Sequence, residues 1–228
     1  MQLGANLPLW DIGGDPAVVR DFSQAAEDMG FDYLGAADHV IGVNEANRPD
    51  WGERNTSADL FHDPFVLFGY LSACTKAIGF STQVLILAQR QRSEEQVRFM
   101  QALWAEPHVS FDGKWHKITD AGINPLPGGG KIPLWFGGHV DETLRRTAKL
   151  GDGWIMLAHP PSDRAITEFE KLRAYTKAEG RDPAQIGLEV WVSVGADGPD
   201  EWRREFEFWR DAGVSHITVN NTYDRGAH

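Results

Sequence analysis

Asp38 and His39 follow directly after an apolar segment, residues 31–36, that has the composition of a buried strand. In an α/β barrel, the side chains that carry out chemistry stand at the carboxyl ends of the strands. A histidine, with an ordinary pKa of about 6.5, can donate or accept a proton near neutrality. The pair therefore predicts an acid–base role for His39, with Asp38 binding a ligand hydroxyl or orienting a loop. A structural role for both residues explains the same positions equally well.

A glycine pair, Gly137–Gly138, separates the apolar segment 132–136 from a helical pattern that ends before Gly151. Glycines let the backbone approach an anion closely, and the first free N–H groups of a helix point at that anion. This strand, turn and helix therefore predict a site for a small anion.

Polar residues interrupt another apolar segment, 78–87, at Ser81, Thr82 and Gln83. Polar groups in a buried strand need hydrogen-bond partners, because burial without a partner costs free energy. Either a bound ligand or the neighbouring backbone can supply these partners, and the sequence favours neither.

The polar segment 44–62 lacks regular periodicity and predicts a long loop. Long loops in compact domains are often lids or binding loops, and Trp51 and Phe61 favour a substrate cover over a solvated connector. Metal-ligand spacings such as H-x-H and H-E-x-x-H are absent, and Asp63 is explained by capping the helix that follows. We therefore expect no catalytic metal.

Seven apolar or β-branched segments alternate with helical patterns along the chain. The predicted strands are 3–7, 31–36, 78–87, 132–136, 153–157, 186–194 and 214–219, and the predicted helices begin near residues 15, 63, 93, 141, 162 and 199. Alternation of this kind favours parallel βα units with helices on the sheet. The fold class is therefore α/β, a TIM-type (β/α) barrel with about seven strands. Residues 108–118 predict a small hairpin insertion with a two-residue turn at Asp112–Gly113.

The 228 residues are expected to form a single domain, residues 1–228, because the composition shows neither disorder nor repeats. A net charge of −11 without Lys/Arg runs argues against nucleic-acid binding. Neither a membrane-spanning segment nor a signal peptide is evident, so a cytoplasmic location is expected.

Together, several segments resemble the luciferase-like monooxygenase family, most closely its branch that uses the deazaflavin coenzyme F420. The resemblance rests on GFDYLGAADH (30–39), IGFSTQVLILAQRQ (78–91), INPLP (123–127), IPLWFGG (132–138) and LGDGW (150–154). It covers most of the chain in the family's order.

This resemblance implies that His39 lies near the deazaflavin ring as the catalytic residue. It implies cofactor-binding roles for Asp38, Thr82, Gln83, Val84, Gly137, Gly138, His139 and Thr143. In the family a non-proline cis peptide bond lies behind the ring, and the matching bond is Gln83–Val84. The family's phosphate-binding turn is matched by Gly137, Gly138, His139 and Thr143, which agrees with the anion site predicted above.

The implied activity is hydride transfer between coenzyme F420 and a small organic substrate, by a protein that forms homodimers. With FMN as the alternative cofactor, the same pocket would activate oxygen. The chain departs from the family pattern where Gln91 runs directly into Arg92, because members carry a further segment there with a glycine-rich fourth strand. A reduced barrel of this kind leaves two further alternatives: a flavin-binding protein without catalysis, and a structural subunit.

Overall fold

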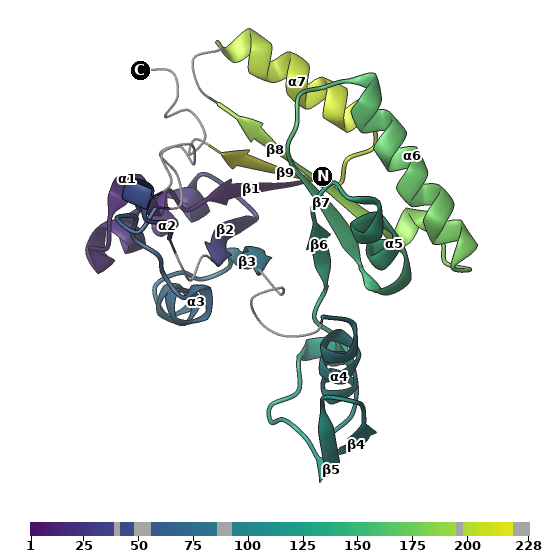
Figure 1. Cartoon of the computed structure of the whole chain (residues 1–228). Coiled ribbons are helices and arrows are strands. Elements are labelled where there is room, and N and C mark those ends of the chain that lie inside the picture. The colour runs from purple at the N-terminus through teal and green to yellow at the C-terminus, as the bar shows by residue number, and fades with distance from the viewer. Residues whose placement is uncertain (39–41, 48–55, 86–92, 195–197, 221–228) are drawn as a thin grey trace.

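The centre of the computed structural model is a parallel sheet (Figure 1). The model describes residues 1–38, 42–47, 56–85, 93–194 and 198–220. The sheet consists of β1 (Gln2–Asn6), β2 (Tyr33–Asp38), β3 (Gly79–Leu85), β6 (Trp135–Gly137), β7 (Gly153–Ala158), β8 (Gly187–Ser193) and β9 (His216–Asn220). These seven strands lie in the order β3-β2-β1-β9-β8-β7-β6, and all neighbours are parallel. The predicted strand pattern and barrel-type architecture are confirmed.

The strands that come first and last along the chain, β1 and β9, pair at the middle of the sheet. The two edges of the sheet are therefore β3 and β6. A closed TIM barrel has eight strands and no edge. Between β3 and β6, the described residues form α4 (Ser93–Ala105) and a separate hairpin of β4 (Val109–Asp112) and β5 (Lys117–Ala121). Within the described residues, no strand therefore stands in the fourth barrel position.

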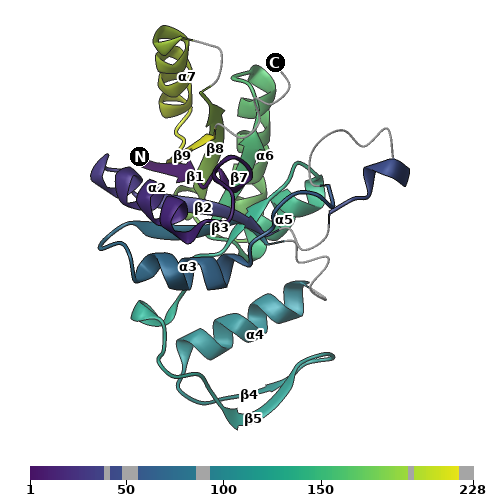
Figure 2. The same ribbon diagram turned by 90° about the vertical axis from the view of Figure 1, so that its left-hand side faces the viewer.

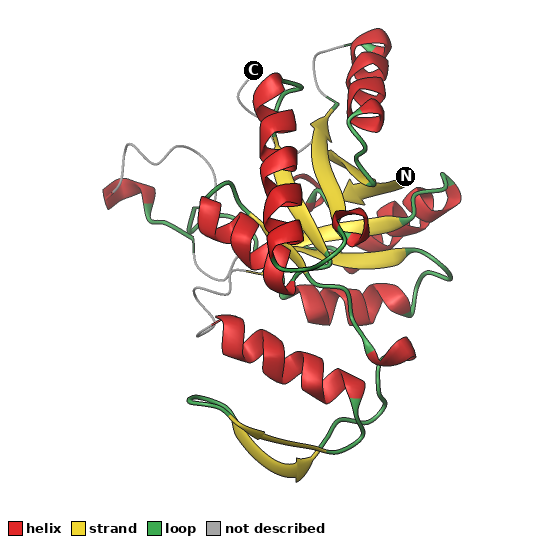
Figure 3. Ribbon diagram, turned by 90° about the vertical axis from the view of Figure 1, so that its right-hand side faces the viewer, coloured by secondary structure: helices red, strands yellow, loops and turns green. Residues whose placement is uncertain are grey.

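The remaining helices follow the strands and cover the outer face of the curled sheet (Figure 3). They are α1 (Leu9–Ile12), α2 (Pro16–Asp28), α3 (Pro64–Ser72), α5 (Asp141–Leu150), α6 (Asp163–Ala178) and α7 (Pro199–Asp211), with short 3-10 turns at Glu45–Asn47, Gly128–Gly130 and Pro183–Gln185. Three helices begin at predicted positions, where the side chains of Asp15, Asp63 and Ser162 accept hydrogen bonds from first-turn backbone N–H groups. In the part of the chain that the structure describes, no helix is long and apolar enough to cross a membrane.

Alternate residues of each strand face the helices and form two apolar clusters. One cluster joins β7, β8 and β9 to α5, α6 and α7 around the fully buried Trp154 and Trp209. The other joins β1 and β2 to α2 and α3 around Leu34 and Leu71. These clusters account for the period-two and helical patterns that the sequence displays.

On the concave face, large rings lie over glycines. The Trp135 ring occupies the space where side chains at Gly153 and Gly187 would stand, and the Tyr33 ring occupies the space at Gly4. A Cβ at any of these glycines would overlap a ring. The interior of the half-barrel is therefore filled by a few large side chains from alternate strands.

Glu95 of α4 organises the hairpin, and the predicted two-residue turn is wrong. Asp112 pairs with Lys117, so the loop has four residues, 113–116. The Glu95 carboxylate accepts hydrogen bonds from the backbone N–H groups of Trp115 (2.7 Å), His116 and Lys114. These bonds satisfy donors that a tight turn would have paired across the strands. The hairpin and α4 stand away from the sheet (Figures 1 and 2).

Candidate functional site

Asp38 ends β2 at the carboxyl edge of the sheet. Its side chain is 2% exposed, and it pairs with Leu85 beyond an irregularity in the β2–β3 register. The edge position agrees with the sequence prediction. His39 lies outside the described residues, so its role stays a prediction.

Gln83 of β3 points into the concave interior and is 1% exposed. Its Nε2 atom donates to Oε1 of Glu189 (2.6 Å) and to Oγ1 of Thr218 (3.1 Å). Its Oε1 atom is buried without a hydrogen-bond partner among the described residues and lies against the α-carbon of Gly35. The sequence left open whether a ligand or the neighbouring backbone supplies the partners of these polar residues. For the amide nitrogen of Gln83, the partners are instead side chains of distant strands.

Thr82 alternates to the other side of β3. It pairs with Ala36, a member of the cluster under α2 and α3, and the preceding Phe80 packs on that same cluster. Strand alternation therefore directs Thr82 towards the helices. Its cofactor role stays a prediction, and so does the cis peptide bond at Gln83–Val84.

The turn after β6 has the geometry of an anion site. Gly138 has a φ of +124°, a conformation that favours glycine, and its carbonyl accepts a hydrogen bond from Nε1 of Trp154 (2.9 Å). Val140 stands at the N-cap of α5 and provides no side-chain cap for the first N–H groups. Thr143 of the first turn is 7% exposed, and its side chain lies beside Gly138.

Basic groups gather beside this turn. The His139 ring lies 6.1 Å from the His159 ring, measured between centroids. Burial lowers the pKa of His139 below its ordinary value, and the positive charges of His159 and Arg164 lower it further, whereas Glu168 opposes the shift. Anion binding at this turn would therefore favour protonation of His139.

One of the two acidic residues in the first turn of α5, Asp141, is paired with neighbouring side chains. Asp141 accepts hydrogen bonds from Tyr175 (2.6 Å) and from Arg145 (2.7 Å). Its carboxylate is therefore paired with groups on α5 and α6. The charge of the Asp141 carboxylate is therefore balanced by Arg145, beside the free N–H groups of the first turn of α5.

A buried polar network in the interior went unnoticed in the sequence. Oε1 of Glu189 accepts hydrogen bonds from Gln83, Thr218 (2.7 Å) and Trp191 (3.2 Å), and the Tyr33 hydroxyl lies 2.8 Å from Oγ1 of Thr218. The signal was present, because Glu189 interrupts the apolar run GLEVWVS as Gln83 interrupts its own strand.

Burial controls the ionisation of this network. Desolvation raises the pKa of Glu189, although hydrogen bonds from Thr218, Trp191 and Tyr33 work in the opposite direction. Desolvation also raises the pKa of Tyr33, and the negative charge of Glu189 adds to that increase. The interior therefore favours neutral forms of both residues.

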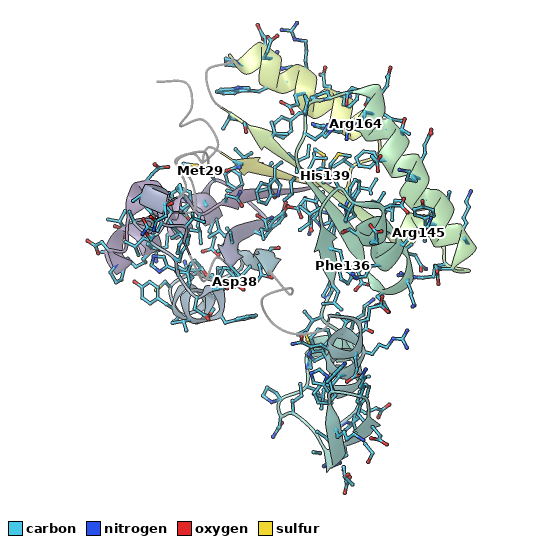
Figure 4. The ribbon with its side chains drawn as sticks, in the orientation of Figure 1. Met29, Asp38, Phe136, His139, Arg145 and Arg164 are labelled. Carbon is cyan, nitrogen blue, oxygen red and sulfur yellow. The ribbon has the colours of Figure 1, made fainter. Side chains whose placement is uncertain are left out.

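The predicted site residues fall into two groups at the carboxyl ends of the strands. Figure 4 shows Asp38 on the β2–β3 side of the curled sheet and His139 on the β6–α5 side. Gln83 belongs to the first group, and Gly137, Gly138 and Thr143 belong to the second. The groups occupy the two edges of the open sheet, and the Glu189 network links the first edge to β8 and β9.

The predicted cover loop is described only at its ends. Val43 and Thr56 form an isolated bridge, and the Thr56 amide donates to Asp59 (2.7 Å). Trp51 lies outside the described residues, so the substrate-cover role stays a prediction. No cluster of three His, Cys, Asp or Glu residues suited to a metal ion occurs in the described ranges.

The family model described as luciferase-like monooxygenase matches residues 87–226. An F420-dependent glucose-6-phosphate dehydrogenase of Kineococcus radiotolerans is 24% identical over 247 aligned positions, which cover 92% of this chain and 73% of that protein. A protein of the same name from Mycolicibacterium gilvum is 26% identical, but the match covers 52% of this chain and 35% of that protein. The matched stretch therefore spans only about a third of the second relative.

Solved structures show the same fold. An F420-dependent secondary alcohol dehydrogenase, in complex with an F420–acetone adduct, superimposes with a TM-score of 0.72 at 16% identity, over 97% of this chain and 93% of that one. The long-chain alkane monooxygenase LadA superimposes with a TM-score of 0.73 at 10% identity, over 99% and 88% of the two chains.

Proposed function

Because this chain belongs to the luciferase-like monooxygenase family, we propose that it is an oxidoreductase that uses coenzyme F420 to transfer a hydride to or from a small organic substrate. The observation that carries the proposal is the glycine turn between β6 and α5, with an uncapped helix start beside His139, His159 and Arg164. Relatives named as F420-dependent dehydrogenases support the choice of coenzyme.

The residues present fit a phosphate-bearing cofactor. Gly137 and Gly138 leave the backbone accessible, and the α5 N–H groups and His139 supply donors for a phosphate. Asp38 and Gln83 supply polar groups at the opposite edge, where the ring is expected. When bound, F420 supplies a carbon centre that accepts or releases a hydride.

The protein's own residues would bind the cofactor and the substrate, orient them and transfer a proton. We propose that His39 holds or moves a proton at the reacting group of the substrate, which suits an imidazole near neutrality. The chain's contribution beyond this proton is orientation and the exclusion of water, for which segment 44–62 is the proposed cover.

The test is a titration of the purified chain with F420 and, separately, with FMN, followed by tryptophan quenching and cofactor absorbance. We expect micromolar binding of F420 and weaker binding of FMN. His39→Ala should keep F420 affinity within about threefold and lower turnover by about a hundredfold or more, the usual contribution of an acid–base group. Binding of neither cofactor would contradict the proposal.

Two alternatives have an observation in their favour. The likeness to LadA supports an FMN-dependent monooxygenase, which predicts that FMN binds more tightly than F420. The seven-strand open sheet supports a flavin-binding protein without catalysis, which predicts tight binding without turnover of any substrate.

We further propose that residues 1–228 act as one cytoplasmic domain that forms a homodimer. Helix α3 supports the dimer, because Phe65 and Val66 on this apolar helix are 56% and 74% exposed. A helix that is apolar on all sides is usually buried, and a second copy of the chain would bury it.

A further inference from the structure

The Glu189 carboxylate joins three strands of the open sheet. Its Oε1 atom accepts hydrogen bonds from Gln83 on β3, from Thr218 on β9 and from Trp191 on its own strand β8. All four side chains are buried, with exposures of 6% or less. One oxygen atom therefore holds side chains that are up to 135 residues apart in the sequence.

Two of these partners stand next to the carboxyl edge of the sheet. Trp191 lies two residues beyond Glu189 along β8, and Gln83 lies two residues before the end of β3, where Leu85 pairs with Asp38. Gln83 uses its amide N–H groups on Glu189 and Thr218. The orientation of its amide is therefore set by the interior network.

We propose that Glu189 is a positioning residue for the proposed cofactor site, which it serves by holding Gln83 and Trp191 in place near the carboxyl ends of β3 and β8. This inference rests on the proposed function. Glu189 itself is not proposed to touch a ligand, because its Oε1 atom already accepts hydrogen bonds from Gln83, Thr218 and Trp191. Without its carboxylate, the Gln83 amide would lose its strongest hydrogen bond, and the Trp191 indole N–H would lose a buried acceptor.

Neighbouring groups influence the ionisation of the Glu189 carboxyl group. Tyr33 and His216 are the titratable groups that face it from β2 and β9, whereas β1 and β7 face it with Gly4 and Ile155. Burial lowers the pKa of His216, and the terminal amine lowers it further. The facing groups are thus mainly neutral near pH 7, and three donated hydrogen bonds stabilise the carboxylate when it ionises.

The experiment compares F420 affinity and thermal unfolding in three variants. Glu189→Leu removes every hydrogen bond to the carboxylate and should weaken F420 binding by about tenfold, the effect of one or two lost hydrogen bonds. Glu189→Gln retains an acceptor oxygen and should restore the affinity to within about threefold. Thr176→Val, the matched control, removes a buried hydroxyl that bonds only within α6 (2.8 Å), and should leave the affinity unchanged.

A pH series separates positioning from simple loss of stability. The affinity of the wild-type chain should change across the pH range in which Glu189 ionises, and the affinity of Glu189→Gln should lack that component. If Glu189→Leu does not fold, Thr218→Val removes the hydroxyl that bonds to Glu189, Gln83 and Tyr33, leaves the other bonds of Glu189 in place, and should weaken binding by about threefold.

The outcomes separate the two proposals. Unchanged F420 affinity in a folded Glu189→Leu variant would overturn the positioning role alone. Binding of neither F420 nor FMN by the wild-type chain would overturn the proposed function, and the positioning role with it.

Discussion

At the residue scale, the charge of the β6–α5 turn depends on His139. The pKa of this ring lies below its ordinary value because of burial and because of the electrostatic effects of His159 and Arg164. The ring is therefore mostly neutral at pH 7.5 and gains charge as the pH falls below its pKa. The same neighbours that disfavour its charge would be compensated by a bound phosphate.

We therefore expect F420 affinity to fall as the pH rises from 5.5 to 7.5, by about tenfold if the protonated ring donates a charge-assisted hydrogen bond. Titrations at a series of pH values measure this dependence. His139→Asn should remove most of it, whereas His108→Asn, on the loop before the hairpin, should not. An unchanged profile in His139→Asn would exclude the ring from the anion site.

At the element scale, glycines determine how closely the strands approach the large interior rings. Gly153 and Gly187 leave room for the Trp135 ring, which also contacts His216 edge-on with a centroid distance of 4.6 Å. The edge strand β6 is only three residues long. Its attachment therefore depends on this ring as well as on its ladder with β7.

Gly153→Ala should lower the free energy of unfolding by about 1–3 kcal/mol, because the added methyl group overlaps the Trp135 ring. Gly69→Ala is the matched control, since this helical glycine of α3 has open space around it. It should raise stability by about 0.5–1 kcal/mol. Urea unfolding measures both values, and equal effects of the two substitutions would contradict the packing account.

A second prediction at this scale concerns the contact between Glu95 of α4 and the β4–β5 hairpin. Burial alone would raise the pKa of Glu95, but backbone N–H groups of Trp115 and His116, the His116 ring and the Lys114 N–H lower it to about 2. Because the folded pKa lies below the ordinary value, the stabilisation by Glu95 is complete above about pH 4.5 and is lost as the pH falls towards 2.

Glu95→Ala should therefore speed hydrogen exchange in residues 109–121 at pH 7 and leave the exchange of β7–β9 unchanged. Glu94→Ala, its exposed neighbour that pairs with Lys149 (3.4 Å), is the control and should have little effect. Mass spectrometry of exchanged peptides gives the comparison. Faster exchange throughout the sheet would show instead that the hairpin stabilises the whole fold.

At the scale of the whole molecule, the described strands leave the sheet open between β3 and β6, and helix α3 presents an apolar face. Unpaired strand edges and exposed apolar surface both favour association. The proposed homodimer would use this helix twice about a two-fold axis.

Val66→Glu should raise the dimer dissociation constant by at least about tenfold, because a charge would be buried without a partner. Sedimentation equilibrium measures this constant, and Ile132→Glu, at an exposed position before β6, serves as the control. A wild-type chain that is monomeric at all concentrations would contradict the dimer, and equal weakening by both variants would place the interface elsewhere.

Local patterns in the sequence predicted the elements well. Asp15, Asp63 and Ser162 cap the helices at the predicted positions, because capping depends on residues one turn away. Apolar and β-branched runs predicted the strands for the same reason, because a run is also a local feature of the sequence. The hairpin turn was wrong because Glu95, on another element, provides the acceptor for the loop N–H groups.

The sequence by itself determined the elements, the order of the strands along the chain and the glycine turn at Gly137–Gly138, since each depends on neighbouring residues. The anion site at that turn stays a prediction. The tertiary structure alone decided that β3 and β6 form open edges and that Gln83 meets Glu189 across the interior. It also decided which polar residue of β3 faces inward. The physical reason is that these contacts join residues 29 to 135 positions apart, so they exist only after the strands have assembled and curled.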